Sequence, residues 1–191
     1  SVLSGYPAHP TVAMMKYPKK TETLPTMPRA LREAGYNNLS FYYGGDADFA
    51  DMRAFFVGAC GISDVGSDKS FPLRERMSKW GVPDKELLER VYKDLTTGKQ
   101  ESPFFKTVLT LSSHEPFDVP VTKFDHPFLN AVNYTDNCLG DFVNKLKASD
   151  LWDNTLIIFV ADHTMRSYPE GRSNDDPDCF HIPMIWMGGA L

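Results

Sequence analysis

Residues 156–163, Leu156-Ile157-Ile158-Phe159-Val160-Ala161-Asp162-His163, are the most informative segment of this chain for its fold class. The first six are all apolar, and β-branched and aromatic side chains predominate among them. Continuous apolar runs of this length are typical of strands that are covered on both faces, as in parallel sheets. The run is far shorter than the roughly 20 residues that a membrane-spanning helix needs. It therefore predicts a central strand over 156–161, followed directly by two polar side chains.

Strand-like and helix-like segments alternate along the rest of the chain. Further strands are predicted over 36–43, 104–111 and 182–187. Helices are predicted over 27–34 (capped by Thr26), over 47–57 and over 127–148. A further helix is predicted that Asp84 caps and Gly98 closes. Residues 58–82 are expected to form a long surface loop. Alternating strands and helices form parallel crossovers, so we predict an α/β fold in which helices cover both faces of one parallel sheet.

The composition excludes several classes of protein. The chain has 191 residues, a formal net charge of −5 and 42% hydrophobic residues, which is ordinary globular composition. No basic cluster larger than Lys19-Lys20 offers an electrostatic footprint for nucleic acid, and no signal peptide is visible. Three cysteines without a C-x-x-C motif give no structural zinc pattern. We interpret them as small buried side chains, and their disulfide status stays open.

Ligands of parallel α/β sheets bind beyond the carboxyl ends of the strands. Asp162 and His163 occupy such a position after residues 156–161. Carboxylate and imidazole are common ligands of Zn²⁺ and Mn²⁺, and one ion can take both where the strand ends and the backbone turns. The alternative is an ordinary acidic turn residue beside a histidine.

Two further polar groups follow predicted strands. His114, after residues 104–111, is a candidate donor to an anionic ester oxygen or a general acid or base, unless it is simply solvated. Residues 43–53 contain Asp46, Asp48, Asp51 and Arg53; the Arg53 guanidinium suits phosphate or sulfate oxygens, or it pairs with Asp48 or Asp51. A fourth candidate, His181, precedes residues 182–187 and lies at the wrong end of a parallel strand unless its loop folds back.

Seven short motifs occur in a characteristic order. They are Leu3-Ser4-Gly5-Tyr6-Pro7, Leu24-Pro25 with Leu31-x-x-Ala34-Gly35-Tyr36, Tyr43-Gly44-Gly45-Asp46, Trp80-Gly81-Val82-Pro83-Asp84, Ser113-His114-Glu115-Pro116-Phe117, Ala161-Asp162-His163 and His181-Ile182-Pro183-Met184-Ile185-Trp186. In this order they resemble the catalytic domain of the sulfatase-like branch of the alkaline phosphatase superfamily. Within that branch they are most similar to the lipoteichoic acid synthase and phosphoglycerol transferase group. The resemblance spans nearly the whole chain and implies a three-layer α/β sandwich with a mostly parallel sheet.

The resemblance also implies roles for the candidate residues. Asp162 and His163 match the ligands of a catalytic divalent metal (Mn, Zn, Mg or Ca), and His114, Asp46 and Arg53 match residues that contact the substrate. His181 and Asp51 are further possible site residues. Thr164 replaces the more usual glycine after the Asp-His pair. Asp51 replaces a tryptophan of lipoteichoic acid synthases, which puts glycerol-phosphate specificity in question.

By the same resemblance, residues 1–191 are expected to be a partial catalytic domain. The nucleophile (a threonine in the transferases or a formylglycine in sulfatases) and an acidic metal ligand would precede Ser1, and the last elements would follow Leu191. The isolated piece is therefore expected to be inactive, with an incomplete metal site. The parent would be an enzyme that cleaves or transfers a phosphate or sulfate ester. The alternative is a non-catalytic binding or scaffold domain that retains the fold.

The resemblance finally implies a setting for the parent protein. Its substrate would be a phospholipid head group or a sulfated or phosphorylated glycan, and nucleic acid is not an expected partner. The domain would lie outside the cytoplasm of a bacterium and meet the membrane only through segments outside these 191 residues.

Overall fold

A computed structural model describes residues 2–9, 11–97, 103–165, 168 and 176–191. Its strands are β1 (Asn38–Tyr43), β2 (Asp64–Val65), β3 (Phe104–Leu109), β4 (Ile157–Val160) and β5 (Met184–Met187). Its α-helices are α1 (Pro18–Thr21), α2 (Met27–Glu33), α3 (Met52–Ala54), α4 (Asp84–Thr96) and α5 (Pro127–Lys147). Shorter 3-10 or π-helical turns are η1 (Met14–Lys16), η2 (Phe49–Asp51), η3 (Phe55–Ala59), η4 (Asp68–Ser70), η5 (Leu73–Glu75), η6 (Trp152–Asn154) and η7 (Pro177–Phe180).

The first three strands form a parallel sheet in the order β2-β1-β3. β1 and β3 pair along their whole length, from Asn38 opposite Phe104 to Tyr43 opposite Leu109. The two strands therefore end level with each other. The loops that follow them leave the same edge of the sheet.

The predicted direction of the last strand is wrong. β5 pairs with β4 in antiparallel fashion, with Met184 opposite Val160 and Met187 opposite Ile157. A parallel return needs a crossover of a dozen or more residues, usually a helix. The described part of the connection between the two strands holds only the short turn η7, and the chain doubles back instead of crossing over.

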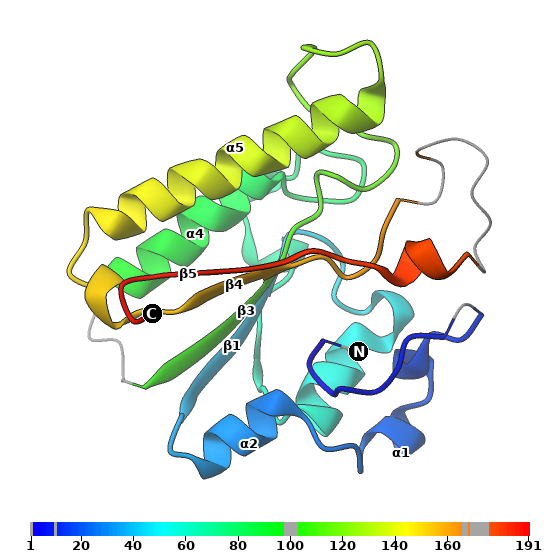
Figure 1. Ribbon diagram of the computed structural model, residues 1–191, viewed down its shortest axis with the longest axis vertical. Coiled ribbons are helices and arrows are strands. Elements are labelled where there is room, and N and C mark those ends of the chain that lie inside the picture. Colours follow the sequence, from blue (N-terminus) through cyan, green and yellow to red (C-terminus); the bar gives the residue numbers. More distant parts are fainter. Residues whose placement is uncertain (1, 10, 98–102, 166–167, 169–175) are drawn as a thin grey trace.

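Helices cover both faces of the parallel sheet, as the sequence predicts (Figure 1). On one face Leu39 and Phe41 of β1 pack against Phe55 and Phe56 of η3, with the rings of Phe41 and Phe56 stacked at 3.7 Å. On the other face α4 and α5 pack over the sheet, in a cluster that includes Leu88, Val91, Phe142 and Leu146. The result is a three-layer α/β arrangement whose core lies on either side of β1 and β3.

Most predicted helices and strands are confirmed within a few residues, but the segment after β1 differs. Residues 47–57 do not form one regular α-helix, because Ala50 (φ 54°) and Asp51 (φ 59°) adopt left-handed backbone conformations that separate η2 from α3. α3 then continues directly into the π-helical turn η3. Thr26 occupies the predicted cap position of α2, but its hydroxyl makes no bond to the helix and donates instead to the carbonyl of Ala59, at 3.2 Å.

The expected surface loop over 58–82 is wrong in part. It contributes strand β2 and several fully or nearly fully buried side chains, among them Ile62, Phe71 and Val82. The polar residues and glycines of this stretch gave no indication of these buried side chains, which pack against residues of β1 and α4.

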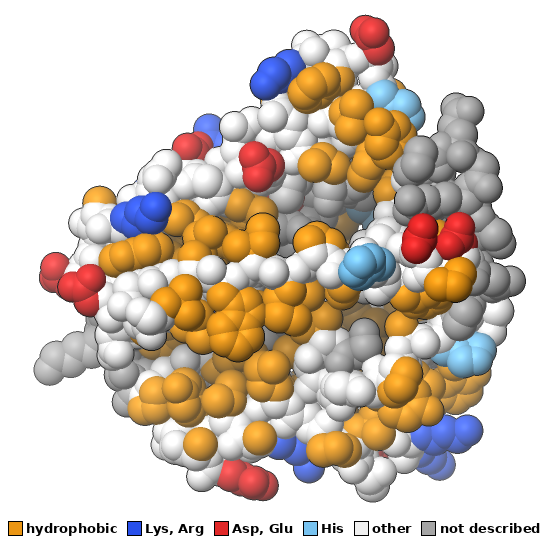
Figure 2. Space-filling model, viewed as in Figure 1, with side chains coloured by type: hydrophobic (Ala, Val, Ile, Leu, Met, Phe, Trp, Pro, Cys, Tyr) orange, Lys and Arg blue, Asp and Glu red, His pale blue; other side chains and the backbone are white. Residues whose placement is uncertain are grey.

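The β4–β5 pair leaves an apolar surface open to solvent. Ile158, Met184, Ile185 and Trp186 are 40%, 60%, 54% and 54% exposed. Figure 2 shows hydrophobic side chains gathered over this pair. The expectation that both strands are covered on both faces is therefore wrong for the described residues, none of which shields this surface.

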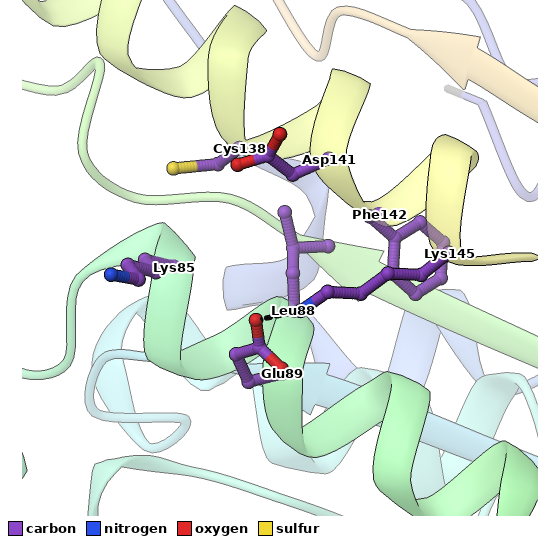
Figure 3. A pocket seen from close by; sticks show the side chains of 7 residues that line it. All are labelled: Lys85, Leu88, Glu89, Cys138, Asp141, Phe142 and Lys145. Carbon is purple, nitrogen blue, oxygen red and sulfur yellow. Dashed lines mark hydrogen bonds and ion pairs between the residues drawn. The ribbon is translucent and has the colours of Figure 1, made fainter.

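α4 and α5 lie against each other and enclose only a small pocket. Lys145 of α5 forms an ion pair with Glu89 of α4 beside Leu88, Cys138 and Phe142 (Figure 3). The pocket has a volume of about 20 Å³, room for little more than one water molecule. Among the described helices, none has the length and apolar character to cross a membrane.

Candidate active site

The carboxyl edge of the sheet gathers most of the predicted site residues. Because β1 and β3 end level, Asp46 and His114 leave the sheet at the same edge, and β4 runs in the same direction in Figure 1. Burial raises the pKa of Tyr43, the last residue of β1, and the carboxylates of Asp162, Asp46 and Asp68 raise it further. Asp162, which follows β4, therefore lies close enough to the end of β1 for its charge to raise the pKa of Tyr43.

Asp162 and His163 have the local geometry of two ligands of one metal ion. Asp162 Oδ2 lies 3.5 Å from His163 Nε2, and two ligand atoms of a tetrahedral zinc site lie about 3.4 Å apart. His163 Nδ1 lies 2.9 Å from the carbonyl of Thr164, which can only accept, so Nε2 is the nitrogen left for a metal. Both side chains are more than 60% exposed. The pair fits a divalent ion, although the described residues hold no group of three or more His, Cys, Asp or Glu side chains placed for one.

His181 lies at the same edge as this pair, contrary to its expected place. The antiparallel pairing sets the start of β5 beside the end of β4, so the residues before Met184 approach those after Val160. The Thr164 hydroxyl donates to the carbonyl of Cys179 at 2.8 Å and ties the two segments together. The reversed direction of β5 therefore places exposed His181 at the same edge of the sheet as Asp162.

Arg53 stands in a chain of alternating charges. Its Nε donates to Asp48 Oδ1 at 2.6 Å, and Lys69 Nζ lies 3.4 Å from Asp48 Oδ2 and 3.9 Å from Asp46 Oδ1. The hydrogen bond from Arg53, with that from Lys69, holds the pKa of Asp48 below its ordinary value of 3.8. Of the two alternatives for Arg53, pairing with Asp48 is the one that the structure contains.

A hollow of about 390 Å³ opens beside this chain of charges. It is lined by Asp48, Asp51, Arg53, Ala54 and Val57, and its volume lies within the range of small-molecule pockets. The left-handed conformations of Ala50 and Asp51 turn the backbone here. Each such residue costs roughly 1–2 kcal/mol relative to a right-handed one, and strain of this kind often accompanies functional sites.

His114 is exposed and lies against Trp80. The two rings meet edge to face at 5.9 Å, and the Trp80 indole N–H donates to the carbonyl of Glu115 at 2.5 Å. His114 Nδ1 lies 2.8 Å from the same carbonyl, so Nε2 is the ring nitrogen left to meet an ester oxygen.

Sequence reasoning assigned no role to Lys69 and Trp80 at this edge, and it assigned Asp84 only the role of a helix cap. Lys69 sits in the stretch taken for a surface loop, where one lysine carries no signal. Trp80 and Asp84 belong to the motif Trp80-Gly81-Val82-Pro83-Asp84, which marked the segment without indicating what it contacts.

The three-layer α/β domain carries carboxylate, imidazole and guanidinium groups at the carboxyl edge of its sheet, where ligands of such sheets bind. A model of the sulfatase family, described as "Sulfatase", matches residues 1–190. The chain therefore belongs to the sulfatase family. A crystal structure of an alkaline phosphatase superfamily protein from Vibrio parahaemolyticus is similar over 100% of this chain, with a TM-score of 0.82 and 33% identity.

Two curated relatives extend the comparison. The lipoteichoic acid synthase-like protein YvgJ of Bacillus subtilis is 27% identical over 164 residues, which are 77% of this chain and 25% of YvgJ. Phosphoglycerol transferase I of Xanthomonas campestris is 30% identical over 149 residues, which are 70% of this chain and 21% of that enzyme. The chain thus spans about a quarter or less of these relatives and 47% of the Vibrio protein.

Proposed function

We propose that residues 1–191 are part of the catalytic domain of a metal-dependent enzyme that transfers or cleaves a phosphate or sulfate ester. The observation that carries this proposal is the 3.5 Å separation of Asp162 Oδ2 and His163 Nε2, with Nδ1 oriented by Thr164. A divalent ion bound by this pair would polarise the ester and lower the pKa of a nucleophile.

The other residues at the edge supply anion recognition. The Arg53 fork suits two oxygens of a phosphate or sulfate. His114 Nε2, when protonated, donates to an oxygen on which charge develops in the transition state. The names of the relatives favour phosphoglycerol transfer; a lipid head group outside the cytoplasm is the donor and setting that the family resemblance implies. A sulfate ester would engage the same groups.

Two observations support a partial domain in these residues. The apolar surface of β4 and β5 is open to solvent, and the chain covers 47% of the Vibrio protein. Further elements of the same polypeptide would cover that surface and supply the nucleophile and the remaining metal ligands. The 191-residue chain alone should therefore show no turnover of phosphodiesters or sulfate esters; robust turnover by the purified chain would refute this part of the proposal.

Manganese binding tests the metal pair directly. Mn²⁺ added to the isotope-labelled chain should broaden the imidazole signals of His163 before those of His9 and His126. Asp162→Asn should abolish this preference, and the exposed Asp150→Asn serves as the matched control that keeps it. Equal broadening in wild type and Asp162→Asn would rule out the pair as a metal site. In the complete parent enzyme, Asp162→Ala should remove manganese-dependent turnover.

One observation favours a non-catalytic domain. Arg53 is already paired with Asp48, and Asp51 adds a second carboxylate to the hollow. A scaffold that lost its chemistry would keep such internal pairs. Wild-type parent protein that turns over neither phosphate nor sulfate esters in the presence of Mn²⁺ would support this second candidate.

A further inference from the structure

Residues 78–84, which we name the bridging segment, connect the loops that follow β1 and β3. On the β1 side, the buried Val82 donates its N–H to the carbonyl of Gly44 at 2.8 Å. Gly44 is two residues from Asp46. On the β3 side, Trp80 and Asp84 bond to the loop that carries His114. The bridging segment therefore contacts both of the loops that contribute candidate substrate-binding residues.

Asp84 is the central polar group of this segment and is 0% exposed. Its Oδ1 accepts the N–H groups of Leu111 at 2.6 Å and Ser112 at 3.1 Å. Its Oδ2 accepts the hydroxyl of Thr135 in α5 at 2.7 Å. In return, the Asp84 N–H donates to Ser112 Oγ at 2.9 Å. A buried carboxylate is costly unless its oxygens are satisfied, and here they are satisfied by the loop after β3 and by α5.

These contacts are not those of a helix cap. The sequence predicts that Asp84 caps α4, but Asp84 is the first helical residue, Pro83 is the cap position, and no side-chain cap bond is made. A cap would bond to N–H groups of its own helix. The carboxylate instead fixes the backbone of a loop 27 and 28 residues further along the chain.

The backbone that Asp84 holds at Leu111 and Ser112 continues directly to His114. The His114 N–H donates to the carbonyl of Leu111 at 3.0 Å, so the turn that carries His114 starts at a residue held by Asp84. Trp80 closes the turn from the other side, through its indole bond to Glu115 and its edge-to-face contact with the His114 ring. Two residues of the bridging segment thus hold the two ends of one short turn.

We propose that Asp84 is a positioning residue of the candidate active site, which sets the place of the His114 imidazole through the backbone of Leu111 and Ser112. The effect on ligand binding rests on the proposed function of His114. The placement of the imidazole against Trp80 is measurable without any ligand. The positioning role of Asp84 and the proposed function of His114 can therefore be refuted separately.

The test compares three variants of the 191-residue chain by NMR. Asp84→Ala leaves two buried N–H groups and the Thr135 hydroxyl without their acceptor. Asp84→Asn can keep Oδ1 on the two N–H groups and donate its amide to Thr135 Oγ1, so it should restore the wild-type result. Thr135→Ala is the matched control, because it removes the bond to α5 and leaves the loop after β3 bonded to Asp84.

Two readouts separate positioning from general stability. The first is hydrogen exchange of the Trp80 indole N–H together with the contact between the Trp80 and His114 rings. The second is the shift of the His114 signal on addition of glycerol phosphate. In Asp84→Ala, indole exchange should rise about tenfold, as expected for a loosened hydrogen-bonded turn, and binding of glycerol phosphate should weaken by about the same factor. Thr135→Ala and Asp84→Asn should retain the wild-type indole exchange rate and the wild-type affinity for glycerol phosphate.

Several results would overturn the inference. One such result is an Asp84→Ala variant that keeps the indole exchange rate and the ring contact of the wild type. Another is a Thr135→Ala variant that loses as much stability as Asp84→Ala and shows equal changes in indole exchange and ring contact. If Asp84→Ala does not fold, Asp84→Ser takes its place; its shorter side chain should loosen the turn in the same way, and unchanged readouts would again refute the positioning role. If glycerol phosphate does not shift the His114 signal of the wild-type chain, the proposed function of His114 is refuted. The indole exchange and the ring contact, measured without ligand, still decide the role of Asp84.

Discussion

Substitution of Gly81 by alanine is expected to be among the most damaging single-methyl changes in this protein. Gly81 has a φ of +141°, a conformation that residues with a Cβ rarely adopt. A Cβ at this position would lie 2.2 Å from the carbonyl oxygen and 3.1 Å from the carbonyl carbon of Gly44. Both contacts are to backbone, so no flexible side chain can move aside to accept the methyl group.

The magnitude follows from two separate costs. Forcing an alanine into this backbone region costs about 1–3 kcal/mol. Moving the two backbones apart breaks the 2.8 Å bond from Val82 N–H to Gly44, and the fully buried donor loses its partner, which costs about 1–3 kcal/mol more. Gly81→Ala should therefore destabilise the chain by about 2–6 kcal/mol in all.

Urea denaturation followed by circular dichroism measures this loss, and Gly140→Ala supplies the matched control. Gly140 is exposed within α5, and a Cβ there meets nothing within 4 Å. The same substitution should stabilise this helix by about 1 kcal/mol. The two changes should thus move the denaturation midpoint in opposite directions, with Gly81→Ala lower by about 1–3 M at an m-value of about 2 kcal/mol/M. A Gly81→Ala midpoint equal to that of wild type would refute the close backbone contact between the bridging segment and β1.

Two further predictions concern ionisation. The Asp48 carboxyl should titrate below its ordinary pKa of 3.8, because Arg53 donates a hydrogen bond to its charged form; the pair is present at neutral pH and lost as pH falls through this lowered pKa. Carboxyl NMR should show the midpoint return toward 3.8 in Arg53→Gln, and an unmoved midpoint would contradict the ion pair. Burial raises the pKa of the Cys60 thiol from 9.0 to about 11. As pH rises, this thiol therefore ionises first in the unfolded chain, and the free energy of unfolding should fall by about 2 kcal/mol between about pH 9 and pH 11. Urea midpoints across this range should fall less steeply in Cys60→Ala, and an equal slope would show that the thiol is not shielded.

The parts of the fold that depend on local pattern were predictable. Apolar spacing along α4 and α5 and the continuous runs of β1, β3 and β4 all identify elements whose character is set by their own residues. The direction of β5 was not predictable, because an apolar run such as residues 182–187 reads the same in either direction. Pairing direction depends on the path of the preceding connection, which local composition does not record.

The candidate site was predictable to the extent that it follows the ends of strands. Asp46, His114 and Asp162 lie where the parallel-sheet rule puts them. Asp84 could not have been identified, because an aspartate at the start of a helix has the same signature whether it bonds to its own helix or to a distant loop. The breaks at Ala50 and Asp51 were not identified either, because alanine gives no signal of a left-handed conformation and an aspartate adopts one in only a minority of cases.

The pairing of Arg53 with Asp48 does not conflict with a role in binding an anion. Their side chains are 38% and 52% exposed, and ion pairs at such exposure contribute little to stability because water and salt screen them. An incoming phosphate or sulfate offers the guanidinium two or three oxygens in place of the one that Asp48 provides, so exchange of partners requires little free energy. Until that exchange, Asp48 holds the Arg53 fork at the hollow and keeps it from other carboxylates. The two alternatives that the sequence left open for Arg53 are thus compatible: the internal pair fixes the cation in the place where the proposed ligand would bind it.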